Sequence, residues 1–486
     1  MEYTVKDILQ LEVAPALGCT EPTAIALGAA AAASLLPVKN RDNQSNGTCF
    51  NHKGHDNQPH GICLNHKNRT DGQHTEDAGC DSRPQIDSIE LWLDPNIFKN
   101  GLAVAIPGTG GLSGLDLASA IGAMAGDPML RMEVLVPIND QDVQNASEFI
   151  RKGKVKVHLL SEHRGLYVKT AVKAGDNLAV STIEVLHDNI TTLELNGQSV
   201  IEHPLYHNTK NLNGNRQKRG NAAELEQSLK QITMNEIIAL ADQFDSDDLD
   251  FIERGIEMNM ALAHHGLEHA CGLQVGTTLN KLADKGLVAR DMIHDARVLT
   301  AAAGDARMSG ARLPAMSSAG SGNHGLTAII PVKAVADHIN AKRDDLCKAV
   351  GLSHIITACI KAHTGRLAAI CACSVAAGAG AAAGTTLLFG GTRGQIGAAV
   401  ENIIEDLAGV ICDGAKNSCA LKLDTAAGAA VQAALFALNG LNVKMTDGIV
   451  GETPEKTIRN IGILSSEGMV ETDRVILKIM LDKILK

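Results

Sequence analysis

The chain has 486 residues, 45% of them hydrophobic but only 2% aromatic, and its formal net charge is −11. This length predicts roughly two to four domains, and 47 glycines with so few aromatics favour a core of closely packed, alanine-rich helices. The acidic balance argues against nucleic acid or an anionic membrane as the main partner, because both require basic surface to neutralise phosphate.

The N-terminal segment predicts two helices within residues 5–36, broken at Pro15–Pro22. Thr20 is typical of a helix N-cap and a proline suits the first turn that follows it. Cys19 would then lie just before a helix N-terminus. Met1–Asp7 shows no basic leader followed by an apolar segment, so we expect a cytoplasmic protein.

Residues 38–85 change sharply to a polar composition typical of a solvated insertion. The insertion also contains cysteines and histidines, at Cys49, His52, His55, His60, Cys63, His66, His74 and Cys80. Two Cys-x2-His spacings could hold zinc, but few apolar residues are present to brace such a site. We expect a mobile loop without a catalytic role.

The next region predicts a small antiparallel β module. Ile86–Leu93 alternates like a strand, and residues 154–201 repeat this alternation around turns at Gly175 and Asn196-Gly197. The glycine-rich run Pro107–Gly114 lacks a phosphate-loop register, so we expect a tight packing turn or a backbone contact to a substrate carboxylate. A polar stretch near 207–221 follows as a linker.

From Ala223 onward the pattern is helical, interrupted by loops. One loop gathers hydroxyl, amide and imidazole groups among glycines, at Ser317, Ser318, Ser321, Asn323 and His324. Such a loop could offer donors to a carboxylate, or it could be a serine-rich and glycine-rich turn that caps a helix. The uncharged run from Leu367 to Thr392 is long enough to span a bilayer, but its small residues favour a buried helix, and we expect no membrane partner.

Three cysteines of the C-terminal half are the main candidates for a functional site. Cys412 and Cys419 flank a turn, and Cys373 lies in the alanine-rich run before them. Eleven cysteines in an unexported chain indicate metal binding or catalysis rather than disulfides. Three thiolates suit an iron–sulfur cluster with one open iron, although buried cysteines also behave as small hydrophobic residues. Lys416, inside the turn, could damp the charge of a cluster, contact substrate or be solvated.

A histidine group on a predicted helix is the other metal candidate. His265 and His269 are four residues apart and share a helix face, beside His264 and Glu268. The group does not match His-Glu-x-x-His and has no evident third ligand. We expect core or surface histidines.

Four motifs together resemble the L-cysteine desulfidase family, which is related to the alpha part of iron–sulfur L-serine dehydratases. The motifs are Gly18–Pro22, Ser317–Gly325, Cys371–Ala377 and Ile411–Leu423. They are long, they occur in the family's order, and the resemblance covers most of the chain outside residues 38–85 and 207–221.

The resemblance implies a [4Fe–4S] cluster held by Cys373, Cys412 and Cys419, with Cys19 as proton acceptor. Cys371 is an alternative to Cys373 as the third cluster ligand. Only one of them is expected to bind, since residues two apart on a helix do not face the same way. We favour Cys373 because Cys373–Ala377 matches the Cys-small-Val-Ala-Ala pattern of the serine dehydratases.

The implied reaction is β-elimination of L-cysteine to hydrogen sulfide, ammonia and pyruvate. The open iron would coordinate the leaving thiolate, and the positive helix N-terminus would favour a thiolate at Cys19 as the base. Substrate carboxylate would bind at Ser317, Ser318, Asn323 and His324. An iron–sulfur L-serine dehydratase is the alternative enzyme, and a non-catalytic iron–sulfur redox or sensor protein is the alternative of another class. We find no motif for pyridoxal phosphate.

We therefore expect an α+β protein with a mostly helical, Ala/Gly-rich catalytic body and a small antiparallel β module inserted in its first half. Its partner would be a small amino acid, with homo-oligomer formation left open. The expected segments are an N-terminal helical part (1–37), the polar insertion (38–85), the β module (86–205), a linker (206–222) and the cluster-binding helical domain (223–486).

Overall fold

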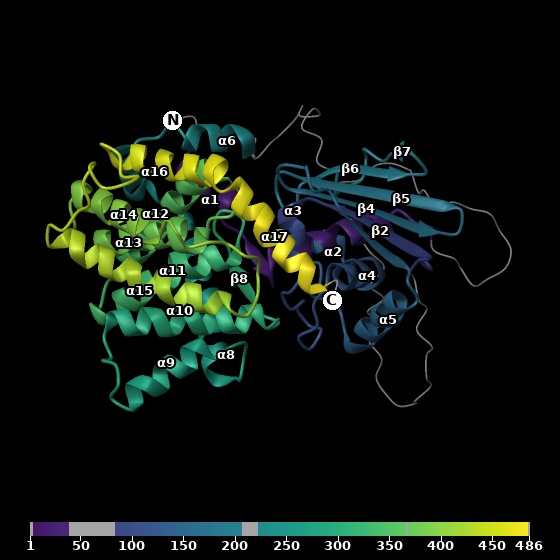
Figure 1. Ribbon diagram of the computed structural model, residues 1–486, viewed down its shortest axis with the longest axis horizontal. Helices are drawn as coiled ribbons and strands as arrows, with labels where there is room; N and C mark the ends of the chain where they lie inside the picture. Colours follow the sequence, from purple (N-terminus) through teal and green to yellow (C-terminus); the bar gives the residue numbers. More distant parts are fainter. Residues whose placement is uncertain (1–2, 38–82, 207–221, 366–367, 485–486) are drawn as a thin grey trace. The chain divides into compact units, whose positions relative to one another are not determined.

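The computed structural model describes residues 3–37, 83–206, 222–365 and 368–484 (Figure 1). Contacts group residues 1–36 with 86–486 as one compact unit and residues 37–85 as another. The predictions for the Cys/His-rich insertion and the polar linker lie outside the described residues, apart from a few residues at their edges, and the segment boundaries remain predictions.

The N-terminal segment forms the two predicted helices, joined by a short strand that was not predicted. Helix α1 (Val5–Glu12) begins with a capping box at Thr4, strand β1 is Pro15–Leu17, and α2 spans Thr20–Ala33. The N-cap of α2 is Cys19 rather than Thr20. Strand β1 pairs antiparallel with β8 (Pro314–Met316), which brings the segment around Cys19 beside the loop that begins at Ser317.

A six-stranded sheet forms the β module, in the order β3-β2-β4-β5-β6-β7. Its strands are β2 (Ser88–Leu93), β3 (Val155–Leu159), β4 (Tyr167–Ala174), β5 (Asn177–Glu184), β6 (Ile190–Leu195) and β7 (Gln198–Ser199). All neighbouring pairs are antiparallel except β2 and β3, which run parallel. The sheet is thus mixed, because helical segments rather than a hairpin connect β2 to β3.

One face of this sheet is covered by helices. Ile89, Leu91 and Leu93 of β2 alternate with partly exposed residues and are fully buried. Helix α2 packs on the sheet, where the Ser181 hydroxyl donates to the Gly28 carbonyl over 2.6 Å. The other helical elements of this region are α3 (Pro95–Gly101), α4 (Leu115–Ala125), η1 (Pro128–Glu133) and α5 (Asp140–Arg151).

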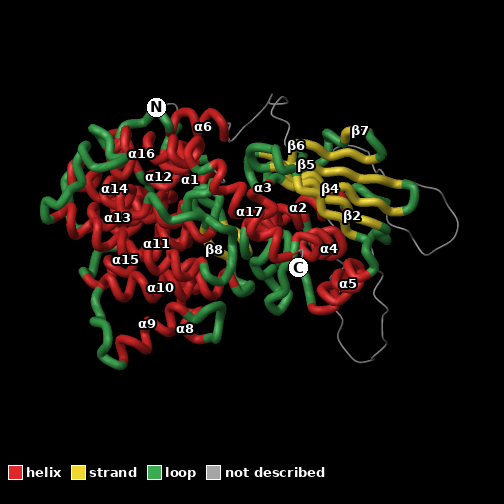
Figure 2. Tube along the Cα trace, in the orientation of Figure 1, coloured by secondary structure: helices red, strands yellow, loops and turns green. Residues whose placement is uncertain are grey.

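The remaining elements form the helical body, in which β8 is the single strand among the described residues (Figure 2). The elements are α6 (Ala222–Leu229), α7 (Met234–Leu240), η2 (Ala241–Gln243), α8 (Ser246–Glu268), α9 (Val275–Asp284), α10 (Met292–Met308), α11 (Gly322–His338), α12 (Arg343–Thr364), η3 (Cys373–Ala377), α13 (Gly378–Leu388), α14 (Arg393–Leu407), α15 (Cys419–Leu438), α16 (Pro454–Ile463), η4 (Leu464–Gly468) and α17 (Val470–Ile484).

Small residues let these helices approach closely. A Cβ on Gly380 of α13 would lie 2.4 Å from the Ser353 carbonyl oxygen of α12, and one on Gly384 would lie 2.5 Å from that of Ala349. Such contacts require glycine, because real Cβ atoms do not approach a backbone oxygen so closely. The α+β class and the Ala/Gly-rich helical body are therefore confirmed.

In the apolar run 367–392, as far as the structure describes it, Cys373–Ala377 forms the π-helix η3 and Gly378–Leu388 the buried helix α13. Within the described part of the chain, one helix, α15, is long and apolar enough to cross a membrane, with 56% of its most apolar window buried. Burial of that kind is common for core helices, so α15 is weak support for a membrane span.

Candidate active site

One cavity gathers most of the residues singled out from the sequence. It is lined by Cys19, Asn323, His324, Cys373, Cys412 and Cys419. It is also lined by Ser321 and Cys371, and by Glu21, Arg307 and Lys361, to which the sequence argument gave no role. These residues come from segments as distant as the start of α2 and the start of α15.

A short backbone bridge places Cys371 beside Cys412. Ile370 and Ile411 form an isolated antiparallel bridge. The Cys371 N–H donates to the Val410 carbonyl over 2.8 Å, and the Cys412 N–H donates to the Ala369 carbonyl over 2.5 Å. The two thiol-bearing segments are thereby held together by main-chain hydrogen bonds, independently of any bound group.

Cys373 is the first residue of the π-helix η3, a rare element that is frequent at functional sites. Cys371 precedes the helix, and its backbone carbonyl accepts hydrogen bonds from the N–H groups of Ser374 and Val375, each over 3.0 Å. The sequence argument assumed that both cysteines lie on one helix. Cys371 lies before the helix, and both residues line the same cavity, so the preference for Cys373 stays a prediction.

The turn from Cys412 to Cys419 is braced by lysines. Lys416 and Lys422 each place Nζ 2.5 Å from Asp413 Oδ1, and this pairing holds the pKa of Asp413, which burial alone would raise, at about 2. Lys416 also donates to the carbonyls of Asp413 and Gly414, over 3.2 and 3.1 Å. Lys416 is thus hydrogen-bonded to the turn that carries the two cysteines, and it is not among the residues that line the cavity.

A buried lysine supports the same turn from α3. Lys99 is 1% exposed, pairs with Asp473 of α17, and donates to the Cys412 carbonyl over 3.2 Å. Gly414 has φ +91°, and a Cβ there would lie 2.6 Å from the Lys99 carbonyl oxygen. The close approach of α3 therefore requires glycine in the turn.

The four thiols influence one another. Hydrogen bonding with Cys371, burial, and the charges of Cys371, Cys419 and Cys412 raise the pKa of Cys373, and burial raises that of Cys419 to about 11. Thiolates gathered in this way would repel one another unless cationic iron compensated their charge. The described residues contain no group of three or more His, Cys, Asp or Glu side chains that could hold a single metal ion. In a cluster each cysteine binds a different iron, so the donor set fits an iron–sulfur cluster better than one ion.

Cys19 is buried at the N-terminus of α2, where its thiol donates to Glu21 Oε2 over 2.9 Å. The Thr20 hydroxyl donates to the same oxygen over 3.1 Å. Burial, followed by the negative charge of Glu21, raises the pKa of Cys19 well above that of an ordinary thiol. The expectation that the helix N-terminus would favour a thiolate was wrong, because desolvation outweighs it.

Arg307 joins the two loops of the cavity and was missed from the sequence. It is 1% exposed, and its guanidinium donates to Asn323 Oδ1 over 2.8 Å and to the Gly18 carbonyl over 2.5 Å. Gly322 leaves the space that the Arg307 guanidinium fills, because a Cβ on residue 322 would lie 2.4 Å from Arg307 Nε. The available signal was an arginine in the last turn of the alanine-rich helix α10, ten residues before Ser317 of the donor-rich loop.

The N-terminus of α11 faces this cavity. Its N-cap, Ser321, makes no side-chain capping hydrogen bond, and the first N–H groups of a helix lack partners within the helix. Asn323 and His324 belong to this first turn. Burial, reinforced by the nearby charges of Lys361 and Arg307, lowers the pKa of His324 to about 3, so its imidazole is neutral at pH 7.

Ser317 and Ser318 lie in the same loop but do not line the cavity. The Ser317 hydroxyl donates to the Ala14 carbonyl over 2.6 Å, and the Ser318 hydroxyl lies 2.9 Å from Nδ1 of His354. Both hydroxyls thus hold the loop against the residue before β1 and against α12, and their assignment to substrate binding stays a prediction.

The other candidates lie elsewhere. The ring centroids of His265 and His269 lie 4.1 Å apart at the C-terminal end of α8, and neither histidine lines the cavity of Cys373, Cys412 and Cys419. The start of the Pro107–Gly114 run packs tightly, since a Cβ on Gly18 would lie 2.2 Å from Cγ of Pro107, whereas a Cβ on Gly110 or Gly111 would have no atom within 4 Å. The packing expected of that run is therefore seen at its start.

Comparison with known proteins places these residues in a family. Residues 145–478 match the family model of the serine dehydratase alpha chain. A UPF0597 protein of Desulforapulum autotrophicum is 63% identical over 485 residues, covering 100% of this chain and 99% of the relative. A UPF0597 protein of Desulfatibacillum aliphaticivorans is 51% identical (99% of each chain), and one of Clostridioides difficile is 36% identical (98% of this chain, 99% of the relative).

Proposed function

Since the chain belongs to the serine dehydratase alpha chain family, and is a lyase-like protein of that kind, we propose that it is an L-cysteine desulfidase. The reaction is β-elimination of L-cysteine to hydrogen sulfide and aminoacrylate, which becomes pyruvate and ammonia after hydrolysis. The observation that carries the proposal is the single cavity lined by four cysteines, the N-terminus of α11 and Cys19.

Cys373, Cys412 and Cys419 would hold a [4Fe–4S] cluster, and Cys371 is a fourth thiol in the same cavity. When bound, such a cluster with one iron free of cysteine supplies a Lewis acid for a sulfur leaving group. The lysines that brace the turn keep Cys412 and Cys419 in place before the cluster is assembled.

The substrate carboxylate binds at the N-terminus of α11. Three features support this position: the free N–H groups and partial positive charge of the first helical turn, the uncommitted Ser321 side chain at the N-cap, and the nearby charges of Arg307 and Lys361. Arg307 acts as a positioning residue, because its hydrogen bonds tie Asn323 to the Gly18 carbonyl.

Cys19 removes the Cα proton only after its own thiol proton has passed to Glu21. The 2.9 Å hydrogen bond supplies that path, since the thiol is the donor and the carboxylate oxygen the acceptor. The Cα–H bond then breaks with proton transfer to the sulfur. Glu21 is thus the partner that a protonated Cys19 needs in order to act as a base.

L-serine is the second candidate substrate, because the matched family model is that of serine dehydratase. A non-catalytic iron–sulfur sensor remains the alternative from another class. A cavity that combines a carboxylate-binding helix N-terminus with a thiol–carboxylate pair favours catalysis, since a sensor needs neither.

The test is an anaerobic purification followed by iron and acid-labile sulfide analysis, an absorption spectrum, and assays on both amino acids. We expect bound iron and sulfide, with release of hydrogen sulfide and pyruvate from L-cysteine at a higher kcat/KM than release of pyruvate from L-serine. A preference for L-serine would make the protein a serine dehydratase. Iron-loaded protein inactive on both substrates would favour the sensor.

A further inference from the structure

Four consecutive carbonyls of the cysteine turn (residues 411–419) accept hydrogen bonds from lysines. In the order of the carbonyls from Ile411 to Gly414, the donors are Lys422 (2.6 Å), Lys99 (3.2 Å) and, twice, Lys416 (3.2 and 3.1 Å). Because a trans peptide points its N–H away from its C=O, the N–H groups of the turn face away from the lysines. Burial raises the pKa of the Cys412 thiol, and the charge of Lys99 and a hydrogen bond from the Gly414 N–H act against this rise.

Lys99 differs from the other two lysines in where it comes from. Lys416 lies inside the turn and Lys422 lies in α15, which directly follows it, so both move with the turn. Lys99 belongs to α3 and lies 313 residues from Cys412 in sequence. The two local lysines can therefore fix the shape of the turn, whereas Lys99 ties the turn to a distant part of the chain.

Asp473 of the C-terminal helix α17 holds Lys99 in this position. The Lys99 side chain is 1% exposed, and its ammonium forms an ion pair with Asp473, whose side chain is 20% exposed. A buried ammonium without a counter-ion is unfavourable, because burial removes its hydration. The Cys412 carbonyl has no net charge that could replace the carboxylate. The hydrogen bond from Lys99 to Cys412 therefore depends on α17.

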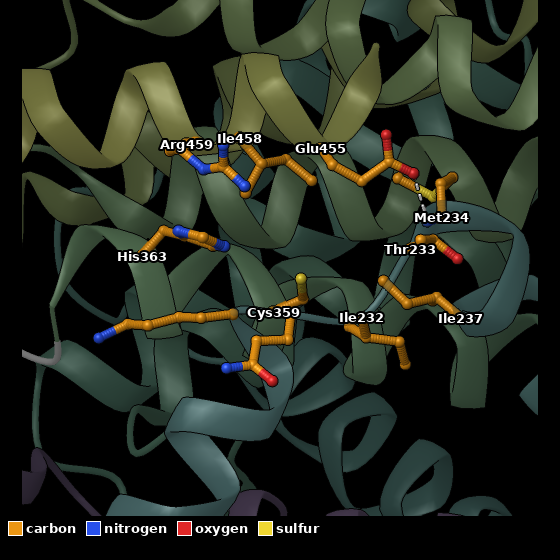
Figure 3. A pocket seen from close by; sticks show the side chains of 11 residues that line it. Ile232, Thr233, Met234, Ile237, Cys359, His363, Glu455, Ile458 and Arg459 are labelled. Carbon is orange, nitrogen blue, oxygen red and sulfur yellow. Dashed lines mark hydrogen bonds between the residues drawn. The ribbon is translucent and has the colours of Figure 1, made fainter. Parts of the chain in front are cut away.

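The helix before α17 is fixed by other contacts. Glu455 of α16 accepts a hydrogen bond from the Met234 N–H of α7 over 2.6 Å (Figure 3). The Thr457 hydroxyl of α16 donates to Glu401 Oε1 of α14 over 2.9 Å. Both contacts join α16 to the helical body without Lys99 or Asp473. Loss of the Asp473 carboxylate would thus loosen α17 from α3 and leave α16 in place.

We propose that Lys99 and Asp473 are positioning residues of the cysteine turn, through which α17 holds the turn in the conformation that retains the cluster. The proposal rests on the cluster assigned under the proposed function. Neither residue is among those that line the cavity, so both act through the Cys412 carbonyl and not on the substrate. Without the pair, the turn opens more readily and bound iron is lost sooner.

The test compares wild type with Asp473→Asn, which removes the charge and keeps the size of the side chain. Anaerobically purified, iron-loaded protein is analysed by hydrogen–deuterium exchange and mass spectrometry, with β5 as a distant reference. Ferrozine, an iron(II) chelator, is then added, and the loss of iron–sulfur absorption is followed. We expect exchange within residues 411–419 to rise about 10-fold or more, the effect typical of losing a charge-assisted hydrogen bond. The absorption should be lost faster, and exchange in β5 should stay unchanged.

Further variants show whether the two residues act together. Asp482→Asn makes the same chemical change at an exposed position of α17 and is expected to behave as wild type. Lys99→Met removes the ammonium and should have at least the effect of Asp473→Asn. In the Lys99→Met background, Asp473→Asn should add little, because the effects of two residues that act as a pair are not additive.

Equal exchange of residues 411–419 in wild type and Asp473→Asn would overturn the positioning role, as would equal rates of absorption loss. A rise of the same size in β5 would mean general destabilisation and would overturn it too. So would a full effect of Asp473→Asn in the Lys99→Met background, because the carboxylate would then not act through Lys99. Wild-type protein without bound iron and sulfide would instead contradict the proposed cluster, and the exchange of residues 411–419 would still decide whether α17 holds the turn.

Discussion

The thiol of Cys19 donates a hydrogen bond to the Glu21 carboxylate over 2.9 Å, at the entrance of α2. Both residues are buried, and the pair faces the cavity that also contains four further cysteines. A thiol that was expected to be ionised is instead protonated and paired with an acceptor.

Replacing Glu21 with Gln is expected to lower kcat about 100-fold or more, because the Cys19 thiol loses the acceptor for its proton and general-base catalysis is worth that much. Cys19→Ser should lower turnover at least as strongly. Iron content should stay at the wild-type level in both variants. Steady-state assays with iron analysis check this, and loss of iron in Cys19→Ser would instead make Cys19 a ligand of the cluster.

Separate Cys371→Ser and Cys373→Ser variants distinguish the two thiols. We expect Cys373→Ser to lose the iron–sulfur absorption and most bound iron, and Cys371→Ser to keep both, because the family pattern assigns the ligand to Cys373. The two residues line the same cavity, and each is a control for the other. The reverse result would transfer the ligand role to Cys371.

Asn323→Ala should raise KM for L-cysteine about 10-fold with a smaller change in kcat, because the first turn of α11 loses a side chain that Arg307 holds in place. Initial rates over a range of substrate concentrations measure the two constants. An unchanged KM would remove Asn323 from the substrate site.

Gly322→Ala tests whether the position of Arg307 matters. The added Cβ would lie 2.4 Å from Nε of a fully buried guanidinium, so we expect about 1–3 kcal/mol of destabilisation and a raised KM. Gly394→Ala, where no atom lies within 4 Å, is the matched control and should be neutral or slightly stabilising. Urea unfolding and initial rates give both quantities; equal behaviour of the two variants would contradict the tight fit.

His354 is expected to make the protein less stable in acid. Burial lowers its pKa to about 4, below the ordinary value of about 6.5, so the unfolded chain binds the proton more readily. The free energy of unfolding therefore decreases as the pH falls from about 6.5 towards 4. This one group contributes on the order of 3 kcal/mol to that decrease. Urea unfolding at pH 8 and pH 5 should therefore differ less in His354→Gln than in wild type; an identical difference would exclude His354 as a contributor.

The sequence by itself determined the local elements and the types of functional group. Period-two alternation and turn residues such as Asn196-Gly197 depend on near neighbours, so the two N-terminal helices and the stranded region within residues 154–201 were predicted. The functional groups of the motifs around Cys19, Asn323, Cys373 and Cys412 also follow directly from the residue types.

The tertiary structure decided which of those groups meet and in what protonation state. Arg307 and Gly18 lie 289 residues apart and are hydrogen-bonded, and the bridge that aligns Cys371 with Cys412 joins two separate loops. Burial is a property of the whole packed chain, and it overrides the helix N-terminus at Cys19. Local patterns therefore identified the thiols, but only the folded chain revealed that Cys19 is protonated and that Glu21 accepts its hydrogen bond.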